Sequence, residues 1–151
     1  MKTTINLLLR LTLLTATAVQ ADAGLLNVPS QFSVQDTAER FAKAAEKAGL
    51  KIFARIDHAA GAAKVDMSLR PTQLVIFGSP KVGTALLTSD QRIGIDLPLK
   101  ALVWQDAEGK VWLSYNSPDY LLGRFAIEDR VSVKQKIAGA LAKFAATATQ
   151  P

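Results

Sequence analysis

Residues 95–116, IDLPLKALVWQDAEGKVWLSYN, decide the fold. Apolar residues alternate with other residues on both sides of Ala107-Glu108-Gly109, the period of a half-buried β-strand. Glycine at the third position of a three-residue hairpin loop supplies the left-handed conformation that such loops commonly need. We therefore predict an antiparallel hairpin with strands at 95–106 and 110–116. Its register places Asp106 opposite Lys110 and Trp104 opposite Trp112.

The alternation divides the hairpin into two faces. The first face is apolar and is predicted to face the core: Ile95, Leu97, Leu99, Ala101, Val103, Val111, Leu113 and Tyr115. The second face carries Asp96, Pro98, Lys100, Leu102, Trp104, Trp112, Ser114 and Asn116. Two facing tryptophans on a more polar face favour a dimer interface or a site for an amphipathic ligand. The alternative is that the pair only stabilises the sheet.

The rest of the chain predicts helices and further strands. We expect an edge strand at 24–29, ended by a proline, and an amphipathic helix at 33–49 with Ser33 as its N-cap. A strand at 50–57 would place Ile52, Ala54 and Ile56 on one face and Phe53, Arg55 and Asp57 on the other. If the second set lies on the open side, it extends the aromatic patch there.

The next segments complete the predicted topology. Residues 58–63 suit a helical turn or a loop, and residues 74–77 suit a central strand because both faces are apolar. A helix starts at Thr84, and Ser132-x-x-Gln135 is predicted to cap a last helix. Helices and strands do not alternate one for one. We therefore expect an α+β domain with antiparallel or mixed strands and the helices on one face.

The N-terminal residues indicate export. A basic start, the apolar run Leu7–Leu14 and small residues up to Ala23 are typical of a signal peptide at 1–23, cut after Ala21 or Ala23. The apolar run is shorter than the roughly 20 residues of a membrane span, so we expect no stable membrane anchor after cleavage. Residues 24–151 would then form one periplasmic or secreted domain.

Composition excludes several classes of function. With no cysteine there is no disulfide, no thiolate metal site and no cysteine nucleophile, and His58 is the only histidine. Loss of Lys2 and Arg10 with the signal peptide lowers the net charge from +5 to +3, or to +4 if Asp22 is also lost. A charge this modest on an exported domain argues against nucleic-acid binding.

Gly78-Ser79-Pro80-Lys81-Val82-Gly83-Thr84 follows a predicted strand and precedes a predicted helix. Such a turn can direct free N–H groups at an anion, with the charge of Lys81 close by. A nucleotide-hydrolysing loop would have lysine where Thr84 stands, so that function is excluded. The alternative is a simple turn with a solvated lysine.

His58 is the one histidine available for chemistry. It follows Asp57 at a strand end, and with Arg70 it could serve as a base, or as a ligand to a metal or haem. The alternative is a hydrogen-bonded structural histidine, because neighbours in a strand point to opposite faces. Covalent haem attachment through C-x-x-C-H is excluded, since the chain has no cysteine.

Three long segments, 52–62, 69–84 and 95–116, resemble the domain-of-unknown-function family 302. The resemblance implies a small two-layer α+β domain similar to TATA-binding-protein-like folds, with a curved antiparallel sheet and helices on one face. It implies no activity. Ser79 stands where the family more often has asparagine. The positions that match the family's motif residues are Asp57, His58, Arg70, Pro71, Lys81, Gly83, Thr84, Asp96, Pro98, Lys100 and Trp104.

Together these patterns favour a non-enzymatic binding or homodimerisation module. Its expected partner is a second copy of the chain or a small amphipathic or anionic ligand, and we expect no cofactor, no metal and no nucleic acid. The expected ligand-binding residues are Lys81, Gly83, Thr84, Asp96, Lys100, Trp104 and Trp112. The alternative function is an enzyme, or a redox, metal or haem accessory, that uses His58 with Asp57 and Arg70.

Overall fold

A computed structural model describes residues 20–151. Most of the expected signal peptide, residues 1–19, lies outside this described part. Among the described residues, no helix is both long and apolar enough to cross a membrane.

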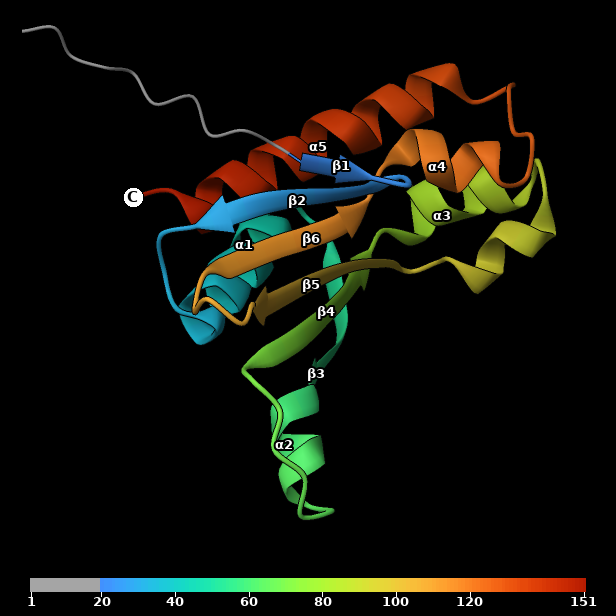
Figure 1. The fold of residues 1–151 in the computed structure, drawn as a ribbon. Coiled ribbons are helices and arrows are strands. Elements are labelled where there is room, and N and C mark those ends of the chain that lie inside the picture. The colour runs from blue at the N-terminus through green and yellow to red at the C-terminus, as the bar shows by residue number, and fades with distance from the viewer. Residues whose placement is uncertain (1–19) are drawn as a thin grey trace, which may run out of the picture.

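Six antiparallel strands form one sheet in the order β1-β2-β6-β5-β4-β3. The strands are β1 (Gln20–Asp22), β2 (Leu25–Ser30), β3 (Lys51–Asp57), β4 (Thr72–Gly78), β5 (Leu99–Gln105) and β6 (Val111–Asn116). All neighbouring pairs are antiparallel. Figure 1 shows the sheet with α1 behind it and the opposite sheet face bare. The two-layer α+β fold predicted from sequence is confirmed.

The helical layer is built on α1 (Val34–Lys47) and α5 (Val131–Thr149), with α3 (Pro80–Leu87), α4 (Pro118–Gly123) and the 3₁₀ turn η1 (Gln91–Ile95) at one end of the sheet. The ring of Phe41 lies at the centre of the core. It packs edge-on against Phe77 of β4 and Phe144 of α5, with ring centroids 5.0 and 6.0 Å away. Offset and edge-on pairs of this kind add to the free energy gained from apolar burial.

The first helix forms where its sequence pattern predicts. Ser33 accepts a hydrogen bond from the Asp36 N–H through its side chain, as an N-cap does. The apolar stripe of the helix, formed by Val34, Ala38, Phe41 and Ala45 at spacings of three and four residues, is buried as expected for an amphipathic helix. After the helix Gly49 has φ +82°, the left-handed conformation that glycine adopts without cost.

The last helix begins one residue before the predicted cap. Its N-cap residue is Arg130, so the Ser132-x-x-Gln135 capping box is not used. The guanidinium Nε of Arg130 donates to the Ala85 carbonyl oxygen and to Ser89 Oγ, both at 2.9 Å. This tertiary anchor to the end of α3 sets the helix start, a contact that no local pattern reveals.

The β5–β6 hairpin has the predicted register, with Trp104 opposite Trp112 and the Asp106 N–H bonded to the Lys110 carbonyl oxygen at 2.9 Å. The first strand starts later than predicted, at Leu99. Ile95 belongs to η1 and is 72% exposed, so its placement in the core is wrong. The N–H groups of Asp96 and Leu97 bond back to the Ile93 carbonyl, which closes a turn where strand pairing was expected.

The faces of β3 differ from the prediction because of a β-bulge between Ile52 and Ala54. Beyond the bulge, Ala54 pairs with Ile76, so Ala54 and Ile56 lie on the bare face. Arg55 points to the helical side instead and binds Glu39 of α1. The extra residue reverses which side chains face the core, which alternation alone does not predict.

Two other boundaries move for local reasons. The strand at 24–29 is not the edge of the sheet, since β1 pairs outside it over Leu25–Asn27. Pro29 lies beyond the end of β1, where its missing N–H costs no ladder bond to that strand. Helix α3 starts at Pro80 rather than at Thr84, because proline suits the first helical turn.

Candidate functional site

An apolar pocket of about 490 Å³ lies on the helical side of the sheet, where the end of β4 meets α1, α3 and α5. Its size falls within the range of small-molecule sites, roughly 300–1,000 Å³. Its main apolar walls are Phe77, Leu86, Leu97, Ile137, Leu141 and Phe144. Among the described residues that line it, Lys136 is the one that carries a charge.

The 78–84 segment forms one wall of this pocket. Gly78, Ser79, Pro80, Val82, Gly83 and Thr84 all line it. Most of the segment is the first turn of α3, and the Gly83 N–H donates to the Ser79 carbonyl oxygen at 2.9 Å. The Gly83 donor is therefore occupied within the helix. A β-carbon at Gly83 would lie 4.0 Å from Leu97 Cδ1, with no nearer described neighbour outside α3, so the absence of a side chain at Gly83 leaves this part of the pocket open.

Two lysines lie at or close to residues that line the pocket. Lys136 is exposed and lies on α5 beside the lining residues Ile137 and Ala140. The ammonium of Lys51 lies 5.3 Å from the ring centroid of Phe53, another lining residue. An anionic group beside these lysines would meet positive charge, while an apolar group would contact the interior walls. Local sequence patterns do not single out Lys136, because none of them distinguishes it from other exposed lysines on helices.

Asp96 and Lys100 lie elsewhere, beside a cavity of about 20 Å³ that Tyr115 also lines. Both carboxylate oxygens of Asp96 accept from Arg124 Nη1, at 2.9 Å each. Lys100 Nζ donates to the Asp96 and Pro98 carbonyl oxygens at 3.1 Å. Burial raises the pKa of the Tyr115 hydroxyl above its ordinary value. Protein partners thus hold both side chains that the sequence proposed as ligand contacts.

Trp104 and Trp112 face each other across the hairpin and alternate with the buried Val103, Val111 and Leu113, so they lie on the bare sheet face, opposite the pocket. Trp104 Nε1 donates to Ser114 Oγ at 2.8 Å, and Ser114 Oγ donates to Asn27 Oδ1 at 2.6 Å. Trp112 Nε1 donates to Asp106 Oδ2 at 2.7 Å. Both indole N–H groups are bonded within the chain, so the pair presents its rings to the bare face, and the ammonium of Lys110 lies 4.1 Å from the centre of the Trp112 ring.

Asp57, His58 and Arg70 lie around the base of a projecting segment that begins with α2 (His58–Ala63). Asp57 Oδ1 accepts the Ala60 N–H at 2.9 Å and so caps α2. Arg70 Nε donates to the Gln105 carbonyl oxygen at 3.1 Å. His58 is exposed. Within residues 20–151, no three His, Asp or Glu side chains gather in an arrangement that could hold a metal ion.

The proposed site residues therefore fall into four places. Gly83 and Thr84 line the pocket, and Lys81 lies on the same helix. Asp96 and Lys100 lie at the small cavity. The two tryptophans lie on the bare face. Asp57, His58 and Arg70 lie at the base of the projecting segment. The seven residues expected to bind one ligand do not line one pocket.

Fold and pocket together define a small two-layer α+β domain with one bare sheet face and an apolar pocket on the helical side. The chain belongs to the family described as "Domain of unknown function DUF302", which matches residues 26–144. It is also similar to the solved structure of an uncharacterized conserved DUF302 protein from Bacillus stearothermophilus, with a TM-score of 0.74 at 17% identity. That match covers 83% of this chain and 98% of the other, and it shows the fold.

Curated relatives are more similar in sequence. "Fluoride-specific ion channel FluC 1" of Brucella suis biovar 1 (strain 1330) is 43% identical over 120 residues, covering 78% of this chain and 47% of that protein. The protein of the same name from Brucella abortus biovar 1 (strain 9-941) is also 43% identical over 120 residues, and 44% of it is covered. The chain spans about half the length of these relatives.

Proposed function

We propose that this protein is an exported, non-enzymatic module that binds a small amphipathic anion in the apolar pocket. The observation that carries the proposal is the composition of the wall. Apolar side chains surround about 490 Å³, and one cation, Lys136, lies among the lining residues. Most known ligand pockets combine an apolar lining with a few polar groups that orient the ligand.

The apolar part of the ligand would occupy the space between Phe77, Leu97 and Phe144. Transfer of apolar surface from water into such a pocket contributes roughly 25 cal/mol for each Å² that is removed from water. The anionic group would stay near Lys136 and near Lys51, which lies over the Phe53 ring. This pose places charge in a solvated position and avoids the cost of burying it.

The lining residues provide an apolar surface and one exposed cation, Lys136. Such a lining can hold a ligand, which supports binding rather than a reaction. The chemistry-bearing residues Asp57 and His58 lie on β3 and α2 and do not line the pocket. Binding at the pocket is therefore the function that the described geometry favours over catalysis at His58.

The test is a titration with the fluorescent amphipathic anion 1-anilinonaphthalene-8-sulfonate, paired with the uncharged probe N-phenyl-1-naphthylamine. Ala140→Phe, which fills the pocket, is expected to abolish binding of both probes. Lys136→Glu is expected to lower the affinity for the anionic probe by roughly three- to tenfold, because it removes a partly solvated charge pair. The affinity for the neutral probe should not change.

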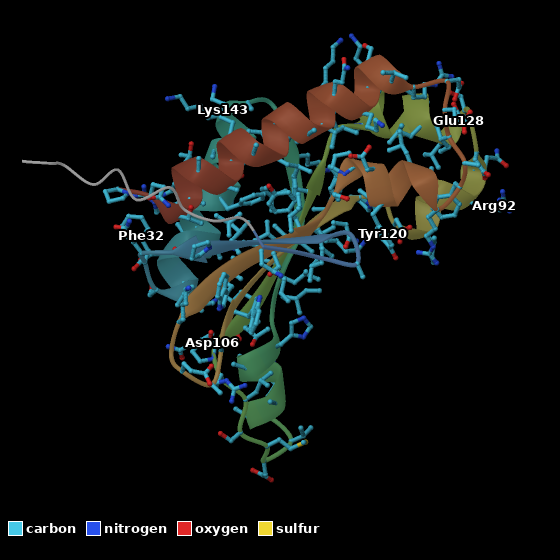
Figure 2. All side chains as sticks on the ribbon, turned by 45° about the horizontal axis from the view of Figure 1, so that its top comes forward. Phe32, Arg92, Asp106, Tyr120, Glu128 and Lys143 are labelled. Carbon is cyan, nitrogen blue, oxygen red and sulfur yellow. The ribbon has the colours of Figure 1, made fainter. Side chains whose placement is uncertain are left out.

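Lys143→Glu is the matched control, because Lys143 is an exposed lysine on the same helix and does not line the pocket. Figure 2 shows it on the outer side of α5. Circular dichroism checks that each variant is folded. Failure of the wild-type chain to bind either probe, or binding by folded Ala140→Phe equal to wild type, overturns the proposal.

A second candidate function rests on the relatives. Proteins named as fluoride-specific ion channels share 43% identity with most of this chain, which covers slightly less than half of each. We propose as this second candidate that the domain assists a fluoride channel. Deletion of the chain from its host should then lower the fluoride concentration that stops growth, and the chain supplied in trans should restore it. Unchanged fluoride tolerance after deletion counts against this candidate.

A further inference from the structure

Residues 58–71, here called the arm, project from the end of the sheet formed by β3 and β4 (Figure 1). The arm exposes large apolar side chains: Val65 is 65% exposed, Met67 67% and Leu69 49%. No residue of α2 is buried. The arm therefore contributes apolar surface that the other described residues, within 20–151, do not cover.

The arm nevertheless has a defined backbone. Asp57 caps α2, and the N–H groups of Val65 and Met67 both bond to the Ala62 carbonyl oxygen at 3.0 Å. At its base, the Gln105 N–H donates to the Pro71 carbonyl oxygen at 3.1 Å, so the arm is tied to the hairpin. Ordering of this kind lowers the entropy lost when a partner binds.

The arm continues into the bare sheet face. Ile56, 41% exposed, precedes it on β3 and pairs with Leu74. The apolar side chains of this face are Ala54, Ile56, Leu74, Ile76, Leu102, Trp104 and Trp112. Lys100 pairs with Ile76 at the edge of this face, but its ammonium turns back to two carbonyl oxygens at the small cavity. The ammonium of Lys110 lies 4.1 Å from the centre of the Trp112 ring, and the arm also exposes Lys64, Asp66 and Arg70. The arm and the bare face therefore form one surface with apolar side chains at its centre and charged residues beside them.

These properties select the kind of partner. Nucleic acids and anionic membranes are bound through several lysines and arginines, whereas Arg70, Lys100 and Lys110 of this surface already contact groups of the same chain. An apolar centre with aromatic residues is typical of protein interfaces. Ile56, Val65, Met67 and Leu69 together expose on the order of 400 Å², and a standard interface buries about 800 Å² on each partner. The half-buried residues of the bare face supply further area.

We propose that this surface is the interface of a homodimer, in which the bare face and the arm of one chain pack against those of a second copy. A two-fold arrangement uses the same patch twice, so each copy provides both the projecting arm and the flat apolar face that covers it. The interface is independent of the pocket, which lies on the helical side.

Sedimentation velocity of the full chain over a range of micromolar concentrations tests the dimer. Wild type is expected to show a concentration-dependent monomer–dimer equilibrium. Met67→Asp on the arm and Leu102→Lys on the bare face are each expected to weaken the dimer at least tenfold. Val131→Asp is the control, because Val131 is 55% exposed at the start of α5, away from the interface.

A second measurement reports on the arm itself. Since the chain has no cysteine, Val65→Cys can carry a single spin label. The label is expected to lose mobility as the concentration rises through the dimerisation range. The proposal is overturned if wild type stays monomeric, if folded Met67→Asp dimerises as wild type does, or if Val131→Asp is as disruptive as Met67→Asp.

Discussion

The indole N–H of Trp112 donates a 2.7 Å hydrogen bond to Oδ2 of Asp106, six residues earlier at the tip of the β5–β6 hairpin. The other oxygen of Asp106 accepts the Lys110 N–H at 2.8 Å and the Glu108 N–H at 3.1 Å. Lys110 Nζ lies 4.1 Å from the centre of the Trp112 ring. One ionised carboxylate thus holds the loop and orients the tryptophan. Figure 2 shows Asp106 at the same end of the molecule as α2.

The first prediction concerns pH. The hydrogen bond from Trp112, followed by those from the Lys110 and Glu108 N–H groups, lowers the pKa of Asp106 below its ordinary value of 3.8. A lowered pKa means that the folded state favours the ionised carboxylate. The stabilisation is therefore complete above pH 3.8 and is lost as the pH falls through the lowered folded-state pKa.

Fluorescence of Trp112 in a Trp104→Phe background is expected to change in that acid range, below pH 3.8. Adding Asp106→Asn should flatten this transition, because the amide keeps an acceptor oxygen for the indole but does not ionise. If the acid transition is equally steep with and without the Asp106→Asn substitution, the prediction is wrong and the transition arises from other carboxylates.

Gly24→Ala is expected to destabilise the chain. Gly24 has φ +89°, and an added β-carbon would lie 2.5 Å from Cβ of Tyr120. Backbone strain alone costs roughly 1–3 kcal/mol, and the clash adds to it. Urea unfolding measures the loss. Gly139→Ala is the control, since its β-carbon would meet nothing within 4 Å and alanine favours the helix by about 0.5–1 kcal/mol.

Phe41→Ala is expected to cost roughly 3–5 kcal/mol of unfolding free energy. The ring is fully buried and packs edge-on against Phe77 and Phe144, so truncation leaves a cavity between the sheet and both long helices. Phe41→Leu refills part of that volume and should therefore lower the free energy of unfolding by clearly less than Phe41→Ala does. Equal losses in the two variants by urea unfolding would contradict a cavity as the cause.

Asp57→Ala is expected to loosen the arm without unfolding the domain. The cap hydrogen bond to the Ala60 N–H holds a six-residue helix with no buried residue, so little else stabilises it. Loss of an N-cap costs about 1 kcal/mol. That cost corresponds to roughly fivefold faster amide exchange in the arm. Hydrogen exchange resolved by peptide measures it, and Asp57→Asn, which can still cap, should stay near wild type.

Local sequence patterns predicted the elements whose contacts are themselves local. The hairpin register follows from alternation on both sides of Gly109, which has φ +83°, and α1 follows from its cap and stripe. Errors occurred where distant residues intervene. Arg130 anchors the start of α5 through Ala85 and Ser89, which precede it by more than forty residues.

The candidate site was only partly visible in the sequence. The 78–84 segment was found because glycine and proline mark a turn, and it does line the pocket. Lys136 was not found, because one exposed lysine on a helix resembles any other solvated lysine. Its relation to Phe77 and Leu97 exists only after β4, α3 and α5 are packed together.

The sequence by itself determined the α+β class, the hairpin and its facing tryptophans, and the family, because these depend on short-range periodicity and on contiguous motifs. Tertiary structure alone decided the reversal of faces at the β3 bulge, the position of β2 between β1 and β6, and the pocket. The physical reason is that strand pairing and helix packing join residues far apart in the chain. Their free energy depends on the whole core, which no local pattern encodes.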